Sequence, residues 1–330
     1  MQQLKTDYLV IGSGAMGMAF SDSLLTETDA NLIIVDKHHQ PGGHWNDAYP
    51  FVRLHQPSAF YGVNSKNLGR DNIDMTGLNK GLYELASNSE VCSYFDQVMQ
   101  GQFLSSGRVQ YFPSCEYKGN GEFVSLLSNE KYFVSFKKEV DSTYMNVVIP
   151  SKRPPPFSIE GDVSCAPLNE LPVLGQRFDD FVLVGAGKTA IDAALFLLKN
   201  EVDPEQIRWI MPRDSWILDR AHIQPTFESL GKLFANQIIP GSEAKDIDDF
   251  FENISNAGGL LRIDDNVKPT MYRCSTVTQA ELKQLKRINN IVRKGRVKTI
   301  RENEIVLEEG SIVTTLNTLH IDCAGDGLAK

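Results

Sequence analysis

Short apolar runs alternate with helical segments along the first part of the chain. The run Tyr8-Leu9-Val10-Ile11 is followed by a segment rich in small residues from about Ala15 to Thr26, and then by Asn31-Leu32-Ile33-Ile34-Val35-Asp36. Continuous apolar strands of this kind are typical of a parallel sheet with both faces covered. The pattern predicts a strand over 7–11, a helix over 15–26 and a buried strand over 31–36.

The following residues are less regular. Their pattern predicts a helical pair around 79–100, and segments rich in aromatic and β-branched residues predict strands at 107–112 and 131–136. Ser151-Lys152-Arg153-Pro154-Pro155-Pro156 then favours an extended linker, because proline fixes φ and lacks a backbone donor.

A second alternating segment begins after this linker. It predicts strands at 178–184 and 207–211, followed by a mainly helical insertion over about 214–290. Within the insertion, Thr278 and Glu281 have the spacing of a capping box, which marks the start of a helix. The last segments predict short antiparallel strands and one final buried strand, at 296–300, 304–307, 312–315 and 319–323.

Length and composition agree with this division. The 330 residues are enough for two domains, which we expect over 1–150 and 179–330, joined by a linker and connection over 151–178. No apolar stretch approaches the ~20 residues that a membrane span needs. The N-terminus runs directly into the first strand, which leaves no room for a signal peptide. We therefore expect a cytoplasmic protein without a membrane span.

The net charge limits the kinds of partner. It is −9, with a pI near 5.3, whereas binding to nucleic-acid phosphates needs clustered Lys and Arg. We therefore expect no nucleic-acid partner. The sequence does not indicate an oligomeric state.

Two glycine-rich turns lie 173 residues apart, each directly after a predicted strand. They are Gly12-Ser13-Gly14-Ala15-Met16-Gly17 and Gly185-Ala186-Gly187-Lys188-Thr189-Ala190. Between a strand and a helix, such a turn places a pyrophosphate on the helix N-terminus, where free N–H groups and the helix dipole stabilise negative charge. One match is a weak indication, but two predict an α/β fold with two Rossmann-like dinucleotide-binding domains.

The residues after the second strand of each domain indicate which nucleotide is bound. Asp36 follows Gly17 by 19 residues, close to the spacing of an acid that accepts hydrogen bonds from a ribose 2′-hydroxyl, and Lys37 lies beside it. The strand at 207–211 is followed instead by Pro212-Arg213. A guanidinium there can pair with a 2′-phosphate, which favours NADPH over NADH. Lys188 would add positive charge near the pyrophosphate.

A third motif follows the first ribose acid. Gly42-Gly43-His44-Trp45 precedes Tyr49-Pro50, Arg53 and Pro57-Ser58. This succession resembles that of flavin-containing and Baeyer–Villiger monooxygenases, and with the two turns the resemblance covers most of the first 215 residues. It implies that the first turn and Asp36 bind FAD, that the second turn binds NADPH, and that Gly43, His44 and Trp45 lie nearer the flavin ring. Asn64 corresponds loosely to an active-site asparagine of the flavin-containing monooxygenases.

The chain departs from this family in two places. The linker signature, phenylalanine-x-glycine followed by a histidine, is replaced by Leu174-Gly175-Gln176-Arg177-Phe178. The sequence also ends soon after the strand at 319–323, where such proteins return to the FAD domain. It is therefore either a fragment or a protein that binds the flavin with fewer residues than usual. Gly325-Asp326 either belongs to this crossing or contacts the flavin.

These observations predict an FAD- and NADPH-dependent oxidoreductase, acting as a monooxygenase on a small organic substrate with O2. NADPH would reduce FAD by hydride transfer, and the insertion, with Trp216 and Phe250, is the candidate for a substrate lid. One alternative is a reductase or dehydrogenase that inserts no oxygen, and the other is a nucleotide-binding protein without turnover. The five cysteines are scattered without a C-x-x-C spacing, which argues against a metal site and against a disulfide reductase.

Overall fold

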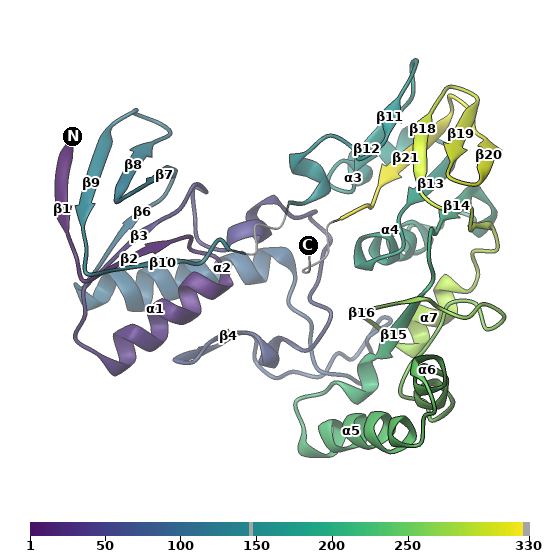
Figure 1. The fold of residues 1–330 in the computed structure, drawn as a ribbon, viewed down its shortest axis with the longest axis horizontal. Coiled ribbons are helices and arrows are strands. Elements are labelled where there is room, and N and C mark those ends of the chain that lie inside the picture. Colours follow the sequence, from purple (N-terminus) through teal and green to yellow (C-terminus); the bar gives the residue numbers. More distant parts are fainter. Residues whose placement is uncertain (145–147, 326–330) are drawn as a thin grey trace. The chain divides into compact units, whose positions relative to one another are not determined.

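The computed structural model describes residues 1–144 and 148–325, which divide into two compact units (Figure 1). The first unit comprises Met1–Leu54, Ser58–Asp71 and Leu85–Val147, and the second comprises His55–Pro57, Asn72–Glu84 and Val148–Lys330. Two short segments within the range expected for the first domain, 55–57 and 72–84, thus belong to the second unit.

The first unit is built on a four-stranded parallel sheet in the order β10-β2-β3-β6. Its strands are β2 (Tyr8–Ile11), β3 (Leu32–Val35), β6 (Val109–Phe112) and β10 (Lys138–Asp141). Successive side chains of β2 and β3 enter two different cores, with Val10 and Ile34 in one and Leu9 and Ile33 in the other. Because both faces are buried, these strands read as continuous apolar runs.

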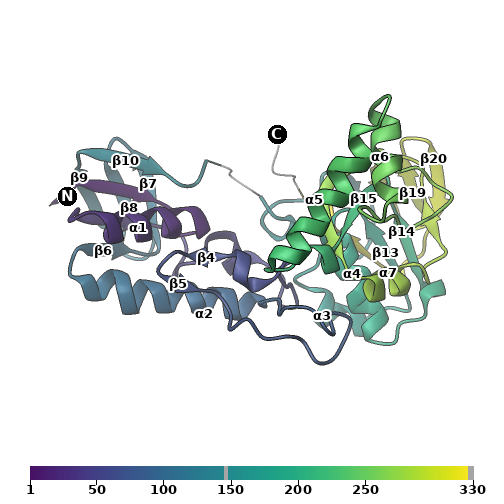
Figure 2. The same ribbon diagram turned by 90° about the horizontal axis from the view of Figure 1, so that it is seen from below.

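Two helices cover one face of this sheet and a second sheet covers the other (Figures 1 and 2). The helices are α1 (Ala15–Glu27) and α2 (Asn88–Val98), joined in their core by the hairpin of β4 (Gly62–Val63) and β5 (Lys66–Asn67). The second sheet runs in the order β1-β9-β8-β7, with β1 (Gln2–Lys5), β7 (Cys115–Gly119), β8 (Glu122–Ser125) and β9 (Lys131–Ser135).

Only the later part of the helical pair predicted around 79–100 is helical. Helix α2 begins after Ser87, which forms a capping box with Glu90, and it continues into a π-helical turn at Met99–Phe103. Residues 79–87 form turns and isolated bridges instead. The prediction for these residues is wrong because the segment 72–84 packs into the second unit, where its backbone bonds to side chains such as Gln224.

The second unit contains a five-stranded parallel sheet in the order β12-β21-β13-β14-β17. The strands are β12 (Cys165–Pro167), β13 (Asp180–Val184), β14 (Ile207–Ile210), β17 (Ile291–Val292) and β21 (Thr318–Asp322). Helix α4 (Lys188–Lys199) connects β13 to β14 and buries its small and aliphatic residues. From β13 the chain continues to β14 on one side of it, and later to β21 on the other side. The carboxyl end of β13 is therefore the switch point, where such sheets bind ligands.

A smaller sheet lies beside it in the second unit. Its strands are β11 (Ser158–Ile159), β18 (Val297–Ile300), β19 (Glu304–Leu307) and β20 (Gly310–Val313). The predicted antiparallel pairing of the last three strands is confirmed. Arg153, from the proline-rich linker, pairs with buried Asp322 at 3.0 Å and thereby fixes the linker at the end of β21.

The insertion after β14 is more mixed than predicted. It holds the helices α5 (Phe227–Ser242), α6 (Ile247–Asn256) and α7 (Gln279–Leu285), but also the parallel strands β15 (Ser215–Asp219) and β16 (Met271–Val277). The predicted capping box of Thr278 and Glu281 is confirmed at the start of α7. In the described part of the chain, no helix is both long and apolar enough to cross a membrane.

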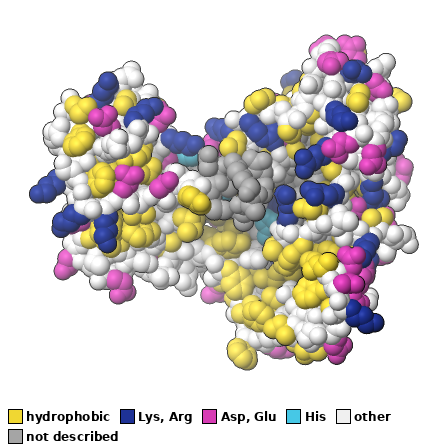
Figure 3. Space-filling model, in the orientation of Figure 1, with side chains coloured by type: hydrophobic (Ala, Val, Ile, Leu, Met, Phe, Trp, Pro, Cys, Tyr) yellow, Lys and Arg dark blue, Asp and Glu magenta, His cyan; other side chains and the backbone are white. Residues whose placement is uncertain are grey.

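Trp216 lies in the core of this insertion. Its ring stacks on Phe251 with centroids 5.9 Å apart, and the Arg262 guanidinium lies over it at 4.9 Å from the centroid. With 2% of its surface exposed, Trp216 cannot face a substrate as part of a lid. The exposed hydrophobic side chains lie instead on α5 and at the start of α6 (Figure 3): Phe227, Phe234, Ile238, Ile239 and Ile247.

Arg220, which directly follows β15, holds the segments 55–57 and 72–84 in the second unit. Its guanidinium is 4% exposed. It donates to the His55 carbonyl at 2.7 Å, to Asn79 Oδ1 at 3.2 Å and to the Thr276 carbonyl at 3.2 Å, and it pairs with Glu281 at 2.9 Å. A buried guanidinium is tolerated only when its charge and its donors are satisfied, and here both conditions are met.

Substitution of Arg220 by methionine is expected to destabilise the second unit. It would leave Glu281 without its cation and several buried acceptors without a donor, and breaking such a pair costs roughly 3–5 kcal/mol. Urea unfolding of the purified chain measures this change. The matched control is Arg301→Met, because Arg301 pairs with Glu160 and Glu304 at the solvent-exposed surface. Equal effects of the two substitutions would contradict the role given to Arg220.

Candidate functional site

The first glycine-rich turn connects β2 to α1. The N–H of Gly12 donates to the Val35 carbonyl at 2.8 Å. A Cβ on Gly17 would lie 2.1 Å from the Gly12 carbonyl oxygen, so only glycine lets α1 begin this close to the strand. Gly14 is the N-cap of α1, with no side-chain cap and no acidic residue in the first turn. The free N–H groups at this helix end can therefore bind an anion.

Ser142 closes the other side of this turn. It follows β10, and its hydroxyl donates to the carbonyl oxygens of Ile11 at 2.5 Å and Gly12 at 3.0 Å. Gly12 has φ +98°, and a Cβ there would lie 2.8 Å from Ser142 Oγ. Sequence reasoning missed Ser142, because only the order of strands in the sheet brings it to the turn.

The structure brings the Gly42-Gly43 motif directly against the first turn. The N–H of Gly42 donates to the Ser13 carbonyl at 2.9 Å, and a Cβ on Gly43 would lie 2.9 Å from Gly14 Cα. Trp45 packs against the core formed by α1 and α2, and His44 is exposed and stacks on the Trp45 ring. Ala15 and Met16 are exposed at the start of α1.

Asp36, the predicted ribose acid, is buried directly after β3. Its Oδ2 accepts from the Ser13 N–H at 2.5 Å and the Ser13 hydroxyl at 2.8 Å. Its Oδ1 accepts from the His38 N–H at 2.7 Å and lies 3.0 Å from His38 Nδ1. Both oxygens are thus occupied, so a ribose hydroxyl would have to replace one of these donors. Lys37, between these residues, is exposed.

His38 links two carboxylates at this site. Its Nε2 lies 2.8 Å from Asp47 Oδ2, while its Nδ1 faces Asp36. Hydrogen bonding to Asp36 raises the pKa of His38 against the opposing effect of burial, and Asp47 raises it further. Burial would raise the pKa of Asp36, but its hydrogen bonds with His38 and Ser13 outweigh burial and lower it. The favoured state is therefore an ionised Asp36 beside a protonated His38.

Asn64, the candidate active-site asparagine, lies exposed at the tight turn between β4 and β5, next to α1. This hairpin is fixed by Tyr94, whose hydroxyl accepts from the Val63 N–H at 2.7 Å and donates to the Lys66 carbonyl at 2.5 Å. The catalytic role of Asn64 stays a prediction.

The second glycine-rich turn repeats this arrangement in the second unit. Gly185 has φ +129°, and a Cβ there would lie 2.8 Å from the carbonyl oxygen of Cys323, which follows β21. Gly187 is the N-cap of α4 without a side-chain cap, and no described atom lies within 4 Å of where its Cβ would be. Ala190 is fully buried at the position of a third glycine. This helix end is also free to bind an anion.

Lys188 is the first residue of α4 and directly follows the second turn. Lys188 forms an ion pair with Asp192 one turn further along α4, and Thr189 is half-buried next to it. His55 is half-buried, and its Nδ1 is enclosed without a hydrogen-bond partner among the described residues. Burial, and then the positive charges of Lys188 and Arg220, hold the pKa of His55 well below its usual 6.5. Sequence reasoning did not single out His55, because its position depends on the segment 55–57 joining the second unit.

Arg213 lies beyond the carboxyl end of β14, where the sequence predicts the 2′-phosphate. Its side chain is exposed, and no described residue forms an ion pair with it. Asp214, the next residue, is buried and paired with Arg293. The cation predicted to bind phosphate is therefore free, whereas the adjacent acid is not.

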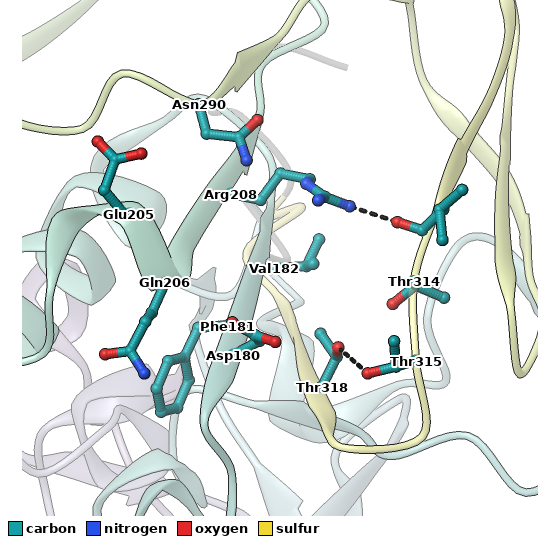
Figure 4. A pocket seen from close by; sticks show the side chains of 11 residues that line it. Asp180, Phe181, Val182, Glu205, Gln206, Arg208, Asn290, Thr314, Thr315 and Thr318 are labelled. Atoms are coloured by element: carbon teal, nitrogen blue, oxygen red, sulfur yellow. Dashed lines mark hydrogen bonds between the residues drawn. The ribbon is translucent and has the colours of Figure 1, made fainter.

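The pocket in Figure 4 lies at the opposite end of this sheet. It is lined by Asp180 and Thr318, the first residues of β13 and β21, whereas Gly185 follows the carboxyl end of β13. Arg208 donates to the Val313 carbonyl, and the hydroxyls of Thr315 and Thr318 are 3.1 Å apart. This pocket is distinct from the predicted nucleotide site.

Comparison with curated proteins identifies relatives longer than this chain. No family model matches. An uncharacterized protein of Mycobacterium tuberculosis is 52% identical over 327 residues, which cover 98% of this chain and 61% of that protein. An uncharacterized protein of Mycobacterium bovis matches with the same values. The chain therefore spans about three-fifths of the length of these relatives.

Solved structures of flavin-dependent enzymes are similar across nearly the whole chain. They include a variant of a flavin monooxygenase from Stenotrophomonas maltophilia (TM-score 0.57, 14% identity, covering 98% of this chain and 79% of that one). Cyclohexanone monooxygenase from Rhodococcus sp. Phi1 bound to NADP+ has a TM-score of 0.57 at 15% identity, covering 97% and 71%. Bacillithiol disulfide reductase from Bacillus cereus has a TM-score of 0.50 at 15% identity, covering 96% and 77%.

At these identities the likeness shows the fold alone. The predicted fold is confirmed: it is the α/β fold, with parallel sheets, of the two-dinucleotide-binding flavoproteins. Because monooxygenases and a reductase both have this fold, it does not separate the two predicted activities.

Substitution of Gly17 by alanine is expected to destabilise the first unit. The new Cβ would clash with the Gly12 carbonyl, and relief of such overpacking costs roughly 1–3 kcal/mol. Urea unfolding would measure the loss. Gly101→Ala is the control, because a Cβ at Gly101 would have no described atom within 4 Å. A Gly17→Ala variant as stable as the control would show that the turn tolerates a side chain.

The His38→Gln variant is expected to lose stability in a pH-dependent way. The pKa of His38 is higher in the folded chain than its ordinary 6.5, so its contribution is complete below that value. The contribution is lost as the pH rises through the raised pKa. Urea unfolding at about pH 6 and about pH 9 should therefore show a larger difference from wild type at the lower pH. His39→Gln, at the exposed neighbouring residue, should show no such trend.

Proposed function

We propose that this chain binds FAD at the first turn and NADPH at the second, as part of an oxidoreductase in which NADPH reduces the flavin. One observation carries this proposal: each turn lies at the switch point of a parallel sheet and leads into a helix whose N-terminus has no side-chain cap. Two such sites in one chain suit two dinucleotides.

The residues around the first turn fit the pyrophosphate of FAD. Gly12, Gly14 and Gly17 keep side chains away from the start of α1. The backbones of Gly14 and Gly43 lie so close together that a Cβ on Gly43 would be 2.9 Å from Gly14 Cα. Asp36 would bind the ribose, with His38 or Ser13 giving up one hydrogen bond. Trp45 and His44 would lie toward the ring system. The chemistry that FAD supplies when bound is the acceptance of a hydride and its transfer onward.

The residues around the second turn fit NADPH. The N-terminus of α4 and Lys188 would hold the pyrophosphate, and Arg213 would hold the 2′-phosphate. The role of these residues would be to bind the pyrophosphate and the adenosine end of NADPH.

We further propose that the activity is that of a monooxygenase acting on a small organic substrate with O2. The resemblance of Gly42–Trp45 and the following residues to the monooxygenases supports this choice, as does the presence of such enzymes among the similar structures. The alternative is a reductase without oxygen insertion, supported by the missing linker histidine and by the similar disulfide reductase. In either case the exposed apolar side chains of α5 are the candidate substrate-facing surface of the insertion.

An absorption spectrum of the purified chain with FAD, recorded before and after anaerobic addition of NADPH, tests this function. We expect a bound-flavin spectrum that NADPH bleaches, and Gly14→Trp should abolish binding by filling the approach to α1. Reoxidation in air with transfer of oxygen to an added substrate would favour the monooxygenase, and reoxidation alone would favour the reductase. A chain that retains no flavin would refute the proposal for these 330 residues.

A further inference from the structure

Asp214 directly follows Arg213, the residue predicted to bind the 2′-phosphate, and both of its carboxylate oxygens accept from Arg293. Arg293 Nε lies 2.8 Å from Asp214 Oδ2, and Nη2 lies 2.9 Å from Oδ1. The Asp214 side chain is 8% exposed. Such a two-pronged contact is the strongest pairing that a carboxylate and a guanidinium form. Each carboxylate oxygen therefore has a charged donor.

The sheet order brings these residues to the edge where the adenosine end of a dinucleotide lies. Strand β14 leads to Arg213 and Asp214, and its neighbour β17 leads directly to Arg293. The two strands are parallel, with Ile210 beside Val292, so their carboxyl ends meet at the same edge. This edge also carries the second glycine-rich turn, because β13 runs parallel to β14.

A second acid keeps the guanidinium in place. Asp264 Oδ2 lies 3.2 Å from Arg293 Nη2 and comes from the insertion rather than from the sheet. Arg293 is thus held between two carboxylates. The ion pair with Asp264 helps to fix the position of the guanidinium beside Asp214. Arg213, by contrast, has no ion-pair partner in the described part of the chain.

We propose that Arg293 is a specificity-determining residue that favours NADPH by masking Asp214. This inference rests on the proposed NADPH site. An uncovered carboxylate at this edge would repel a 2′-phosphate and would accept a hydrogen bond from the 2′-hydroxyl of NADH. With Asp214 masked, the 2′-phosphate meets the free guanidinium of Arg213. Arg293 therefore acts through Asp214 and is a positioning residue.

Binding of NADP+ and NAD+ to the purified chain, measured separately by calorimetry, tests the inference. In Arg293→Gln, the preference for NADP+ over NAD+ should fall by roughly tenfold, and more at low ionic strength, because the Asp214 carboxylate loses its cation. In the double variant Asp214→Asn/Arg293→Gln the preference should return toward wild type, since the Asp214 carboxylate is removed while Asp264 is the same in both variants. If the ion pair were merely structural, the second substitution would not restore the ratio of NADP+ to NAD+ affinity.

The matched control is Arg296→Gln, which removes one positive charge from the same loop without a described contact to Asp214. It should leave the preference close to wild type. If Arg293→Gln does not fold, Arg293→Lys replaces it, because one ammonium group cannot cover both carboxylate oxygens and should lower the preference less. Circular dichroism would verify that each variant is folded.

The possible outcomes separate this inference from the proposed function. A wild-type chain that binds both nucleotides without preferring NADP+ would overturn the inference alone. So would a preference that survives in Arg293→Gln, or one that is not restored in the double variant. A wild-type chain that binds neither nucleotide would refute the second cofactor site itself, and the inference with it.

Discussion

Both glycine-rich turns depend on one constraint, the close approach of the segment after a neighbouring strand to the first glycine. At Gly12 the space for a Cβ is filled by Ser142, and at Gly185 it is filled by the Cys323 carbonyl. In each unit the strand before the turn has parallel neighbours on both sides. The backbone must therefore leave the plane of the sheet in a sharp turn before the next helix begins. The absence of side chains at this point leaves the helix N-terminus open to a phosphate.

The two sites differ in how they treat the acid beyond the neighbouring strand. The carboxylate of Asp36 accepts hydrogen bonds from Ser13 and faces His38. A ribose hydroxyl could replace one of these donors. Asp214 is held by a guanidinium on both oxygens, and its neighbour Arg213 forms no ion pair with a described residue. The first unit thus has a buried carboxylate beyond the strand next to its turn, and the second unit has an exposed guanidinium at the corresponding place.

Much of this arrangement could be predicted from the sequence. The strands before Gly12 and Gly185, the helices after them and the capping box at Thr278 are local features, set by hydrophobic period, glycine position and side-chain spacing. The failure around 79–87 has the opposite origin. That segment takes its conformation from contacts in the second unit, where Arg220 and Gln224 bind it, and no local pattern encodes those partners.

The sequence by itself determined that the chain has two dinucleotide folds, where each glycine turn lies, and which cation follows the second strand of the second unit. Only the tertiary structure decided which residues close each turn and which charges are masked. Ser142 reaches Gly12 across 130 positions of the chain, and Arg293 reaches Asp214 across 79. Strand order creates these contacts. Because a strand pairs with neighbours that can come from anywhere in the chain, the sequence near a turn does not reveal what faces it.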